Sequence, residues 1–571
     1  MSTCISQQTC SLSADGQRFV FRGVYDADVV EFYRTLPGAK WDRVSRVWTC
    51  RLTPAAAMRC WAFGLNAETE LLGPRFRQAI DAAHARFWKA YRAEWGWQPD
   101  QRAFAQWPHQ RAAYHFAQEL PGCLLPIPMG GGKTKVAIDL LMNSRTAVRN
   151  VLILCPTSVR AVWRGEFHKH GPSYRLHILD NGTVRQKRQW VEQDCEDDRQ
   201  HGDPSIVVVN YESAWRAPLG SWILERDWDW VILDESHRIK AHNSSVSKFC
   251  AKLHYRAKRR LCLTGTPMPH SPMDLFGQFR FLDPGVFGDS WFQFRSRYAE
   301  TRNPNIPQQI TGFINQEEMR ERMAWITSPE VDCKLGLPPA RHEEVTYAMT
   351  PGQRKVYEAM ERELCTELEG GVVTAANALV KLLRLQQVIG GWLTPDDSDI
   401  PERVDPTHAN AKRETLIDML EDLPVSEPVV VFAWFRADLD EIQQAAATLG
   451  RRYGELSGRS RGLTDDGKLP DDVDLLGVQC ASGGLGVDLS RASYAVMYSL
   501  GNISPGSYDQ ILARLVRPGQ RRPVLFWHLL AENTIDQYMY RARAEKRDAI
   551  DYVLSALRNP ESEEELNEDR G

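Results

Sequence analysis

The stretch Met129–Thr134 combines the side chains and the backbone freedom that a phosphate-binding loop needs. Its three consecutive glycines are Gly130, Gly131 and Gly132. They leave backbone N–H groups open to a phosphate chain because no Cβ blocks the approach. Apolar residues recur at helical spacing after Thr134, so the loop should end at a helix N-terminus, which favours an anion. Lys133 would reach the β- and γ-phosphates and Thr134 would bind Mg²⁺.

An ordinary glycine-rich turn before a helix is the alternative interpretation of this stretch. The complete phosphate-binding pattern begins with a further glycine, and Ile127 stands in its place between Pro126 and Pro128. The choice between the two interpretations therefore depends on residues further along the chain.

A pair of carboxylates follows a second apolar run. Val231–Leu233 is typical of a strand that is covered on both faces, and Asp234 and Glu235 come directly after it. Asp234 would hold the Mg²⁺ shell, and Glu235 would orient and deprotonate the attacking water. The separation from Lys133 is 234 − 133, or 101 residues, which suits two strands of one α/β domain. This motif favours a nucleotide-hydrolysing site over a simple turn.

Other polar residues at element ends extend the candidate site. Gln110 lies at a predicted helix start, 23 residues before Lys133, and its amide could pair with the N6/N7 edge of adenine. Thr264 and Thr266 follow the apolar run 261–263, at the carboxyl end of a strand where open α/β sheets bind ligands.

Length and composition describe a large globular chain. The 571 residues allow several domains, and 43% hydrophobic and 25% charged residues are ordinary globular values. We find neither a run of about 18 apolar residues nor a secretory signal, so we expect an intracellular protein without a membrane partner, cytoplasmic or nucleoid-associated in a bacterial or viral setting. With a formal charge of −4, the chain must bind any polyanion in a local groove. The 12 cysteines are expected to be reduced core thiols.

Apolar runs predict two lobes, each with a buried parallel sheet and alternating helices. The runs of the first lobe are 151–158, 206–212, 231–233 and 261–263, and those of the second are 429–434, 475–480, 495–500 and 524–530. Helical patterns between them cover 317–326, 353–369 and 375–389. The acidic stretch 192–203 and the Asp- and Pro-rich stretch 394–407 are expected to be loops.

Residues 1–66 show a different pattern, with alternating strands at 19–22 and 46–52 around a short helix at 29–36. This order is similar to the HARP module that precedes the motor in annealing-type helicases. A small α+β core with a solvated basic face is the alternative interpretation.

The ordered set of Gln110, the glycine loop, Asp-Glu-Ser-His at 234–237 and Thr-Gly-Thr-Pro at 264–267 is similar to the superfamily-two helicases. Residues 234–243 and 281–287 look like the Swi/Snf-type double-stranded DNA translocases, and the helical patterns between the lobes resemble that family's protrusions. Residues 481–489 match the family motif that joins the nucleotide state to the DNA grip, and residues 510–520 match its last motif.

The resemblance implies roles for further residues. Arg514 and Arg517 are three residues apart, are expected on one helix face, and would act as arginine fingers. The remaining expected nucleotide contacts are Gly486 and Asp488. The expected DNA contacts are Thr157, Ser158, Thr264 and Ser482. The residues expected to couple the two activities are His237, Thr266 and Gln510.

The predicted fold class is therefore α/β, with two RecA-like parallel-sheet lobes, helical protrusions and a small N-terminal α+β module. The expected divisions are 1–66 for the module, 67–97 for a connecting helix, 98–336 and 337–558 for the lobes, and 559–571 for an acidic disordered tail. Such a chain would use ATP and Mg²⁺ to move along duplex or forked DNA with little sequence preference, remodelling protein–DNA complexes or annealing strands. A strand-separating helicase, the motor of a restriction-type complex, and a DNA clamp without catalysis remain alternatives. The sequence names no protein partner.

Overall fold

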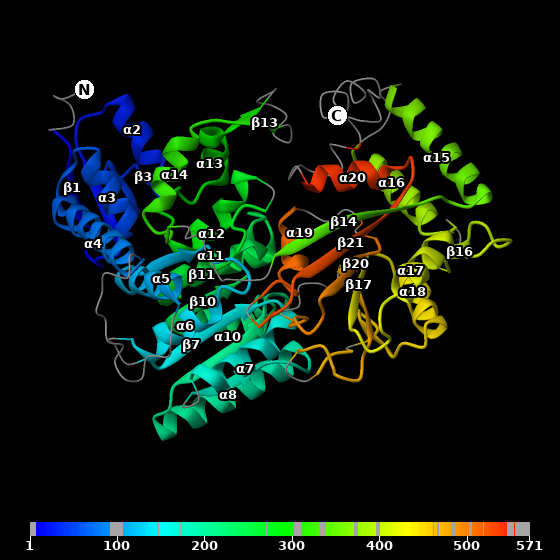
Figure 1. The fold of residues 1–571 in the computed structure, drawn as a ribbon. Coiled ribbons are helices and arrows are strands. Elements are labelled where there is room, and N and C mark those ends of the chain that lie inside the picture. Colours follow the sequence, from blue (N-terminus) through cyan, green and yellow to red (C-terminus); the bar gives the residue numbers. More distant parts are fainter. Residues whose placement is uncertain are drawn as a thin grey trace. The chain divides into compact units, whose positions relative to one another are not determined.

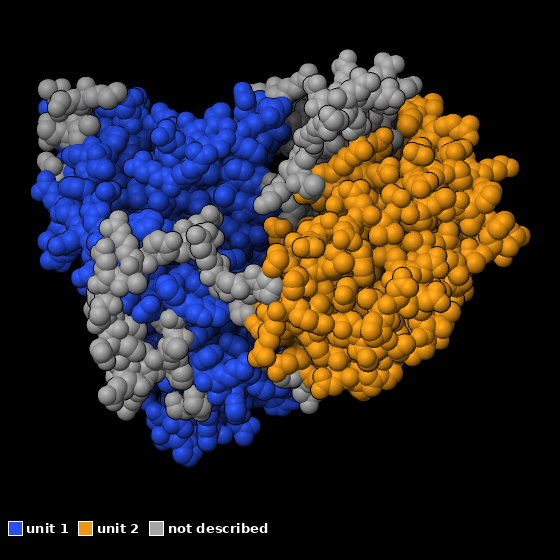
Figure 2. Space-filling model, viewed as in Figure 1, with its two compact units in different colours: residues 1–333 blue, residues 334–571 orange. Residues whose placement is uncertain are grey.

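The structure is a computed structural model in which the chain forms two compact units, Met1–Cys333 and Lys334–Gly571 (Figure 2). It describes residues 7–91, 107–144, 148–171, 174–269, 271–301, 310–329, 339–369, 375–395, 400–460, 462–464, 467–480, 487–499, 501, 505–517, 519–544 and 553. Within these ranges, we find no helix whose length and apolar character would let it cross a bilayer.

Unit 1 is built on a six-stranded parallel sheet with the order β6-β11-β10-β7-β9-β8 (Figure 1). Its strands are β6 (Gly122–Leu125), β7 (Asn150–Cys155), β8 (Arg175–Ile178), β9 (Ser205–Asn210), β10 (Trp228–Asp234) and β11 (Ala257–Leu263). The side chains of residues 151–154 and 206–209 are fully buried, as expected when both faces of a parallel sheet are covered. The four strands predicted for this lobe are confirmed, and the short strands β6 and β8 at the two sheet edges were missed.

Helices alternate with these strands along the chain. They are α4 (Glu68–Tyr91), α5 (Pro108–Glu119), α6 (Lys133–Met142), α7 (Arg160–His170), α8 (Val184–His201), α9 (Tyr211–Ala214), α10 (Leu219–Glu225), α11 (Ser245–Leu253), α12 (Leu275–Leu282), α13 (Trp291–Tyr298) and α14 (Gln316–Ala324). Short 3₁₀ turns are η1 (Thr157–Val159), η2 (Ser236–Ile239), η3 (His254–Arg256) and η4 (Pro272–Asp274), and a hairpin pairs β12 (Ala299–Thr301) with β13 (Ile310–Phe313).

The acidic stretch 192–203 is mostly helical, so the prediction of a loop there is wrong. It forms the second half of α8, which begins with a capping box at Thr183 and ends at Gly202, where φ is 77°. Val191, Cys195 and Asp198 are buried at helical spacing. Only two apolar residues mark the buried face, too few to reveal the period in a stretch rich in carboxylates.

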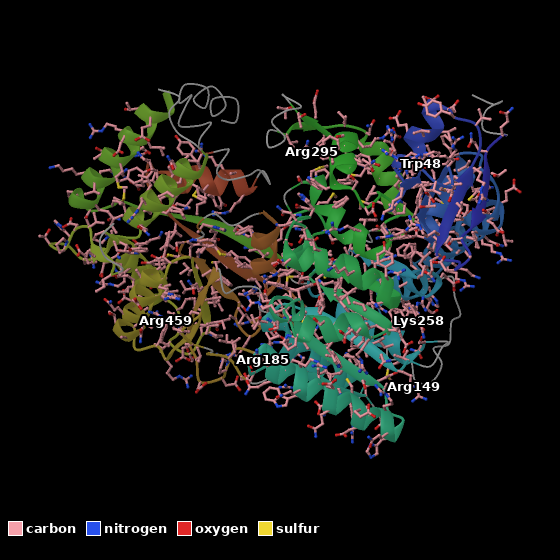
Figure 3. All side chains as sticks on the ribbon, turned by 180° about the vertical axis from the view of Figure 1, so that it is seen from behind. Trp48, Arg149, Arg185, Lys258, Arg295 and Arg459 are labelled. Carbon is pink, nitrogen blue, oxygen red and sulfur yellow. The ribbon has the colours of Figure 1, made fainter. Side chains whose placement is uncertain are left out.

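The N-terminal part of unit 1 is a five-stranded sheet of order β3-β4-β2-β1-β5 with two helices. Its elements are β1 (Thr9–Leu12), β2 (Arg18–Arg22), α2 (Ala27–Arg34), β3 (Lys40–Asp42), β4 (Val47–Arg51), α3 (Pro54–Ala62) and β5 (Asn66–Ala67). The ring of Trp48, on β4 in Figure 3, lies 6.2 Å from that of Tyr33 and 5.8 Å from that of Trp41. The module is α+β as predicted, and its likeness to HARP stays a prediction.

Helix α3 belongs to two cores at once. Ala57 and Cys60 pack inside the N-terminal module, whereas Ala55 and Met58 pack in the large core around the six-stranded sheet. A helix whose two faces are buried in different cores fixes those cores to each other. The module is therefore a packed part of unit 1.

Polar contacts reinforce this junction. The carboxylate of Asp283, which follows α12, accepts hydrogen bonds from the N–H groups of Ala55 (3.0 Å) and Gly285 (2.7 Å). The buried Arg59 donates to the carbonyl oxygens of Thr35 and Gly285, both at 3.2 Å. A Cβ on Gly285 would lie 2.3 Å from the nitrogen of Ala56, so the backbones approach too closely for any other residue.

Unit 2 contains a second six-stranded parallel sheet, of order β14-β21-β20-β17-β19-β18 (Figure 1). Its strands are β14 (Ala340–Tyr347), β17 (Val429–Ala433), β18 (Tyr453–Leu456), β19 (Leu475–Gln479), β20 (Tyr494–Met497) and β21 (Val524–Ala531). Its other elements are α15 (Pro351–Glu369), α16 (Ala375–Ile389), β15 (Trp392–Leu393), β16 (Glu402–Arg403), α17 (Ala411–Glu421), α18 (Arg436–Thr448), α19 (Pro505–Leu512) and α20 (Ile535–Ala544).

The two parallel sheets confirm the predicted α/β class with two RecA-like lobes. The four strands predicted for the second lobe and the three predicted helices are present, whereas the edge strands β14 and β18 were missed. The stretch 394–407, predicted as a loop, contains the two-residue strand β16. The predicted boundaries at 97/98 and 336/337 and the tail 559–571 lie outside the described residues.

Candidate functional site

The glycine loop lies between β6 and α6, and its glycines are required by the backbone. Gly130 and Gly132 have φ values of 76° and 81°, in the region that favours glycine. A Cβ on Gly131 would lie 2.5 Å from Cγ2 of Ile127, which packs where the complete pattern has its first glycine. Gly132 is the N-cap of α6, so the first N–H groups of the helix follow directly at Lys133 and Thr134.

Lys133 meets the carboxylate pair at this edge of the sheet. Its Nζ lies 3.5 Å from Oε1 of Glu235, and both side chains are largely buried. Glu235 has a φ of 50°, a left-handed conformation that costs energy for a residue with a Cβ. Its Oε2 is buried without a hydrogen-bond partner among the described residues, although Nδ1 of His237 lies 3.4 Å away.

Asp234 is held rigidly at the end of β10. Its Oδ2 accepts a hydrogen bond from Nε1 of Trp163 and its Oδ1 accepts one from the N–H of Glu235, both at 3.0 Å. Its own carbonyl accepts a bond of 2.8 Å from the hydroxyl of Tyr211. Burial, and then the neighbouring Glu235, raise the pKa of Asp234 to about 6.

This donor set fits a hydrated Mg²⁺ that is shared with phosphate. Magnesium in such sites takes one or two carboxylates, with waters and phosphate oxygens completing its shell. Asp234 and the hydroxyl of Thr134, on the first turn of α6, supply hard oxygen donors, and Glu235 keeps a buried oxygen that no described residue hydrogen-bonds. Burial first, and then the neighbouring Glu235, raise the pKa of Asp234, and a bound divalent cation would favour the charged carboxylate.

Contacts among His237, Thr264 and Thr266 join the loops after β10 and β11. Nδ1 of His237 lies 3.1 Å from Oγ1 of Thr264, and the N–H of Thr266 donates to the same hydroxyl at 3.1 Å. Burial lowers the pKa of His237, which favours a neutral ring. Thr264 is fully buried, so its side chain serves this contact here, and a DNA contact from it stays a prediction.

Gln110 lies against the glycine loop. Its Oε1 accepts from the N–H of Trp107 and its Nε2 donates to the carbonyl oxygen of Gly131, both at 3.0 Å. An amide has two donor hydrogens and two acceptor lone pairs. One of each is used here, which leaves one of each for an adenine edge.

Thr157 and Ser158, predicted to contact DNA, form the turn η1 at the end of β7. Arg160 holds this turn because its Nε donates to the carbonyl oxygen of Thr157 at 3.0 Å while its Nη1 donates to the carbonyl oxygens of Leu179 and Asp180. Thr157 is exposed. The side chain of Ser158, and the whole of Ser482 and Gly486, lie outside what the structure describes.

The predicted arginine pair belongs to unit 2 and does not lie on a helix. α19 ends at Leu512, so Arg514 and Arg517 lie in the turns that follow, and the expected shared helix face is wrong. Arg514 is buried, and Nε and Nη1 have no partner among the described residues. Burial lowers its pKa to about 10.

Arg517 instead faces Asp488. Its Nη1 donates to the carbonyl oxygen of Val487 at 2.9 Å, and its Nε lies 3.8 Å from Oδ1 of Asp488. That carboxylate also accepts from the N–H and hydroxyl of Ser490. Gln510, the third residue predicted here, lies on α19 and is partly buried.

Sequence reasoning missed the residues that hold the motifs in place. His109 lies 2.8 Å from the carbonyl oxygen of Gly131, and Trp163, Tyr211 and Arg160 fix the loops after β7 and β10. Trp163 stands in an apolar helical pattern and Tyr211 in the apolar run 206–212, and both patterns also describe ordinary core residues. The adjacency of His109 to Gln110 was the one available signal.

Comparison with known proteins identifies related sequences. The family model of the SNF2-related domain matches residues 80–390, more than half of the chain. The chromodomain-helicase-DNA-binding protein 1-like of Danio rerio is 25% identical over 451 residues, which cover 76% of this chain and 42% of that protein. Protein p41 of Acyrthosiphon pisum secondary endosymbiont phage 1 is 25% identical over 80% of this chain and 99% of its own. The chain thus spans under half of the fish protein and nearly all of the phage protein.

A human relative and a solved structure extend the comparison. The DNA excision repair protein ERCC-6 of Homo sapiens is 25% identical over 76% of this chain and 31% of its own. The Sulfolobus solfataricus SWI2/SNF2 ATPase core in complex with dsDNA is 20% identical, covers 81% of this chain and 96% of its own, and has a TM-score of 0.36. The fold assignment rests on the two strand orders. With the SNF2-related domain matched over residues 80–390, the chain belongs to the SNF2-related family of Swi/Snf-type, superfamily-two helicase-like ATPases.

Proposed function

We propose that this chain hydrolyses ATP and uses the energy to move along double-stranded or forked DNA. The observation that carries the proposal is the meeting of the glycine loop, Lys133, Asp234 and Glu235 at one edge of the unit 1 sheet. Lys133 lies beside the free N–H groups at the start of α6, and a bound phosphate can draw its ammonium group away from the buried carboxylate of Glu235. This arrangement suits a triphosphate that is to be cleaved.

The residues of unit 1 would divide the chemistry among them. Thr134 and Asp234 would hold Mg²⁺, which neutralises charge on the phosphates. Lys133 would exchange its contact with Glu235 for the β- and γ-phosphates. Glu235, freed from the lysine, would orient the attacking water and accept its proton. Its strained backbone would hold the carboxylate in place during this step.

The two arginines of unit 2 would complete the site when ATP draws the units together. An arginine finger is worth about 10³ to 10⁵ in rate because it stabilises transition-state charge. Arg514 suits this role because its guanidinium has unused donors among the described residues. Hydrolysis would release the units, and alternate closing and opening would shift their grip on the DNA backbone.

The proposed track is DNA, held mainly through its phosphates. The names of the relatives support this choice, since they include a DNA-binding protein and a DNA excision repair protein. Contacts through Thr157, Ser158 and Ser482 would carry little sequence information and would weaken as salt rises. Remodelling of protein–DNA complexes or annealing of strands would follow from tracking on duplex.

The test is an ATPase assay with duplex, forked and single-stranded DNA and with RNA. We expect duplex or forked DNA to stimulate hydrolysis at least about tenfold, and Glu235→Gln to reduce the stimulated rate by about 10² to 10⁴. Glu192→Gln, the same change on the exposed face of α8, is the matched control and should hydrolyse ATP normally. Stronger stimulation by RNA would exclude the proposal.

Two further assays separate the alternatives. A strand-separating helicase would unwind a fork, whereas a duplex translocase would displace a triplex-forming strand without unwinding. A DNA clamp without catalysis would bind DNA and show no ATPase activity in any condition.

A further inference from the structure

We propose that His109 is a positioning residue that sets the phosphate affinity of the nucleotide site. The inference rests on the proposed function, because it concerns how the same site holds its triphosphate. The imidazole Nε2 lies 2.8 Å from the carbonyl oxygen of Gly131, in the middle of the glycine loop. No motif discussed above includes this histidine.

The contact fixes the direction of a single peptide group. A carbonyl oxygen can only accept, so Nε2 of His109 carries the hydrogen and donates it. Gln110 donates to the same oxygen at 3.0 Å, which fills both of its lone pairs. The peptide between Gly131 and Gly132 is planar and trans, so its N–H points opposite to the carbonyl. Two donors on Gly131 therefore aim the N–H of Gly132 away from α5.

That N–H belongs to the residue that caps α6. Gly132 directly precedes Lys133, and its N–H adds to the row of free N–H groups at the helix N-terminus. A glycine peptide that is free to rotate would present its N–H to a phosphate only part of the time. The two donors pre-organise it, so that binding a phosphate need not first order the loop.

The surroundings of His109 support a fixed role. The side chain is buried on α5, next to Gln110, and burial lowers its pKa, which favours a neutral ring at physiological pH. Its ring packs against that of Trp107, with centroids 5.6 Å apart. On the loop side, Gly131 is confined by Ile127, and a Cβ on Gly132 would meet Nε2 of Gln110 at 2.1 Å. The loop is thus seated directly on the start of α5.

His109 and Gln110 should affect binding differently. The amide of Gln110 keeps one donor and one acceptor for adenine, so it would serve both the base and the loop. His109 uses its only ring hydrogen on Gly131 and would serve the loop alone. Loss of His109 should weaken every ligand that carries the phosphate chain by the same factor, whatever its base.

The experiment measures equilibrium binding of Mg²⁺-ATP, Mg²⁺-GTP and inorganic tripolyphosphate to the full chain by calorimetry. We expect His109→Ala to raise all three dissociation constants about two- to tenfold, the range for one lost hydrogen bond. His109→Gln places an amide Nε2 close to where the ring nitrogen was and should restore binding. Gln110→Ala should, in addition, reduce the preference for ATP over GTP.

His115→Ala is the matched control, because it removes the same side chain six residues further along α5, where the ring lies against Tyr114. It should leave all three dissociation constants unchanged, and melting curves will show that each variant is folded. Unaltered tripolyphosphate binding in His109→Ala would overturn the inference, as would an equal loss in His115→Ala or failure of His109→Gln to recover. If the unmodified chain bound neither ATP nor tripolyphosphate, the proposed function itself would fail.

Discussion

Replacing Arg514 by methionine should stabilise unit 2 and remove its activity at the same time. The guanidinium is buried, and its Nε and Nη1 have no partner among the described residues. Burial lowers the pKa of Arg514 to about 10. Relative to an ordinary arginine, this corresponds to a cost of about 3 kcal/mol for holding the charge there. Methionine fills much of the same volume without that cost.

We therefore expect Arg514→Met to raise the free energy of unfolding of unit 2 by about 1 to 3 kcal/mol, allowing for imperfect packing of the new side chain. For a unit of this size, each kcal/mol raises Tm by about 2 to 4 °C. If Arg514 acts as the proposed arginine finger, ATP hydrolysis should fall at least about 10³-fold. A variant that is more stable but less active would indicate that the buried charge of Arg514 serves function and not stability.

Arg451→Met is the matched control within the same unit. Arg451 is also buried, but its guanidinium donates to four carbonyl oxygens, those of Leu420, Leu423, Val425 and Glu427, at 2.9 to 3.1 Å. Removing it leaves these acceptors unsatisfied, at about 1 kcal/mol each. The same substitution should therefore destabilise unit 2 by about 3 to 4 kcal/mol.

Hydrogen exchange on peptides from β17, β20 and β21 measures both changes without requiring the whole chain to unfold in one step. Slower exchange in Arg514→Met and faster exchange in Arg451→Met is the expected pair. Destabilisation of Arg514→Met by more than about 1 kcal/mol would show that the guanidinium stabilises the fold, and ATPase activity at the normal rate would refute its role as a finger.

Three further predictions concern other parts of the molecule. Glu235→Gln should reduce hydrolysis by about 10² to 10⁴ while ATP still binds, so filter binding that showed lost affinity would contradict its role as base. In Gly285→Ala, the new Cβ would lie 2.3 Å from the nitrogen of Ala56, so the free energy of unfolding of unit 1 should fall by about 1 to 3 kcal/mol. Hydrogen exchange should become faster in α3 but not in β17, and unchanged exchange in α3 would contradict the close packing of Gly285 on α3. His528 has its pKa lowered to about 3 by burial, then by His342 and Arg543, so below about pH 6.5 the unfolded chain gains a proton that the folded chain does not. The free energy of unfolding of unit 2 should therefore fall by about 2 kcal/mol when the pH is lowered from about 6.5 to 5. Urea titrations of His528→Gln should show a smaller fall over the same pH range.

The parts of the fold that could be predicted are those in which buried positions are occupied by an uninterrupted run of apolar residues. Uninterrupted runs such as 151–155 and 429–433 have no other good interpretation, and the carboxylates at 234–235 directly follow such a run. Edge strands lack this signal. β14 has the sequence Ala-Arg-His-Glu-Glu-Val-Thr-Tyr and is mostly exposed, so only its pairing with β21 makes it a strand.

Within the site, the sequence identified the motif residues but not their supports. Trp163, which binds Asp234, and Asp283, which caps α3, act across long separations that a linear pattern does not contain. Arg514 shows the reverse case. Spacing alone put it on a helix face with Arg517, but α19 ends at Leu512, so both arginines lie in the turns that follow.

The double membership of α3 has a practical consequence for anyone who wishes to shorten this chain. A version starting at the predicted lobe boundary, residue 98, would strip Ala55, Met58, Phe76 and Phe87 from the large core. The side chain of Phe116, which is buried in the full chain, would then be exposed to water. Exposed apolar surface of this kind promotes aggregation during expression. The two lobes should therefore be produced with the N-terminal module attached, even when only the proposed ATPase activity is to be measured.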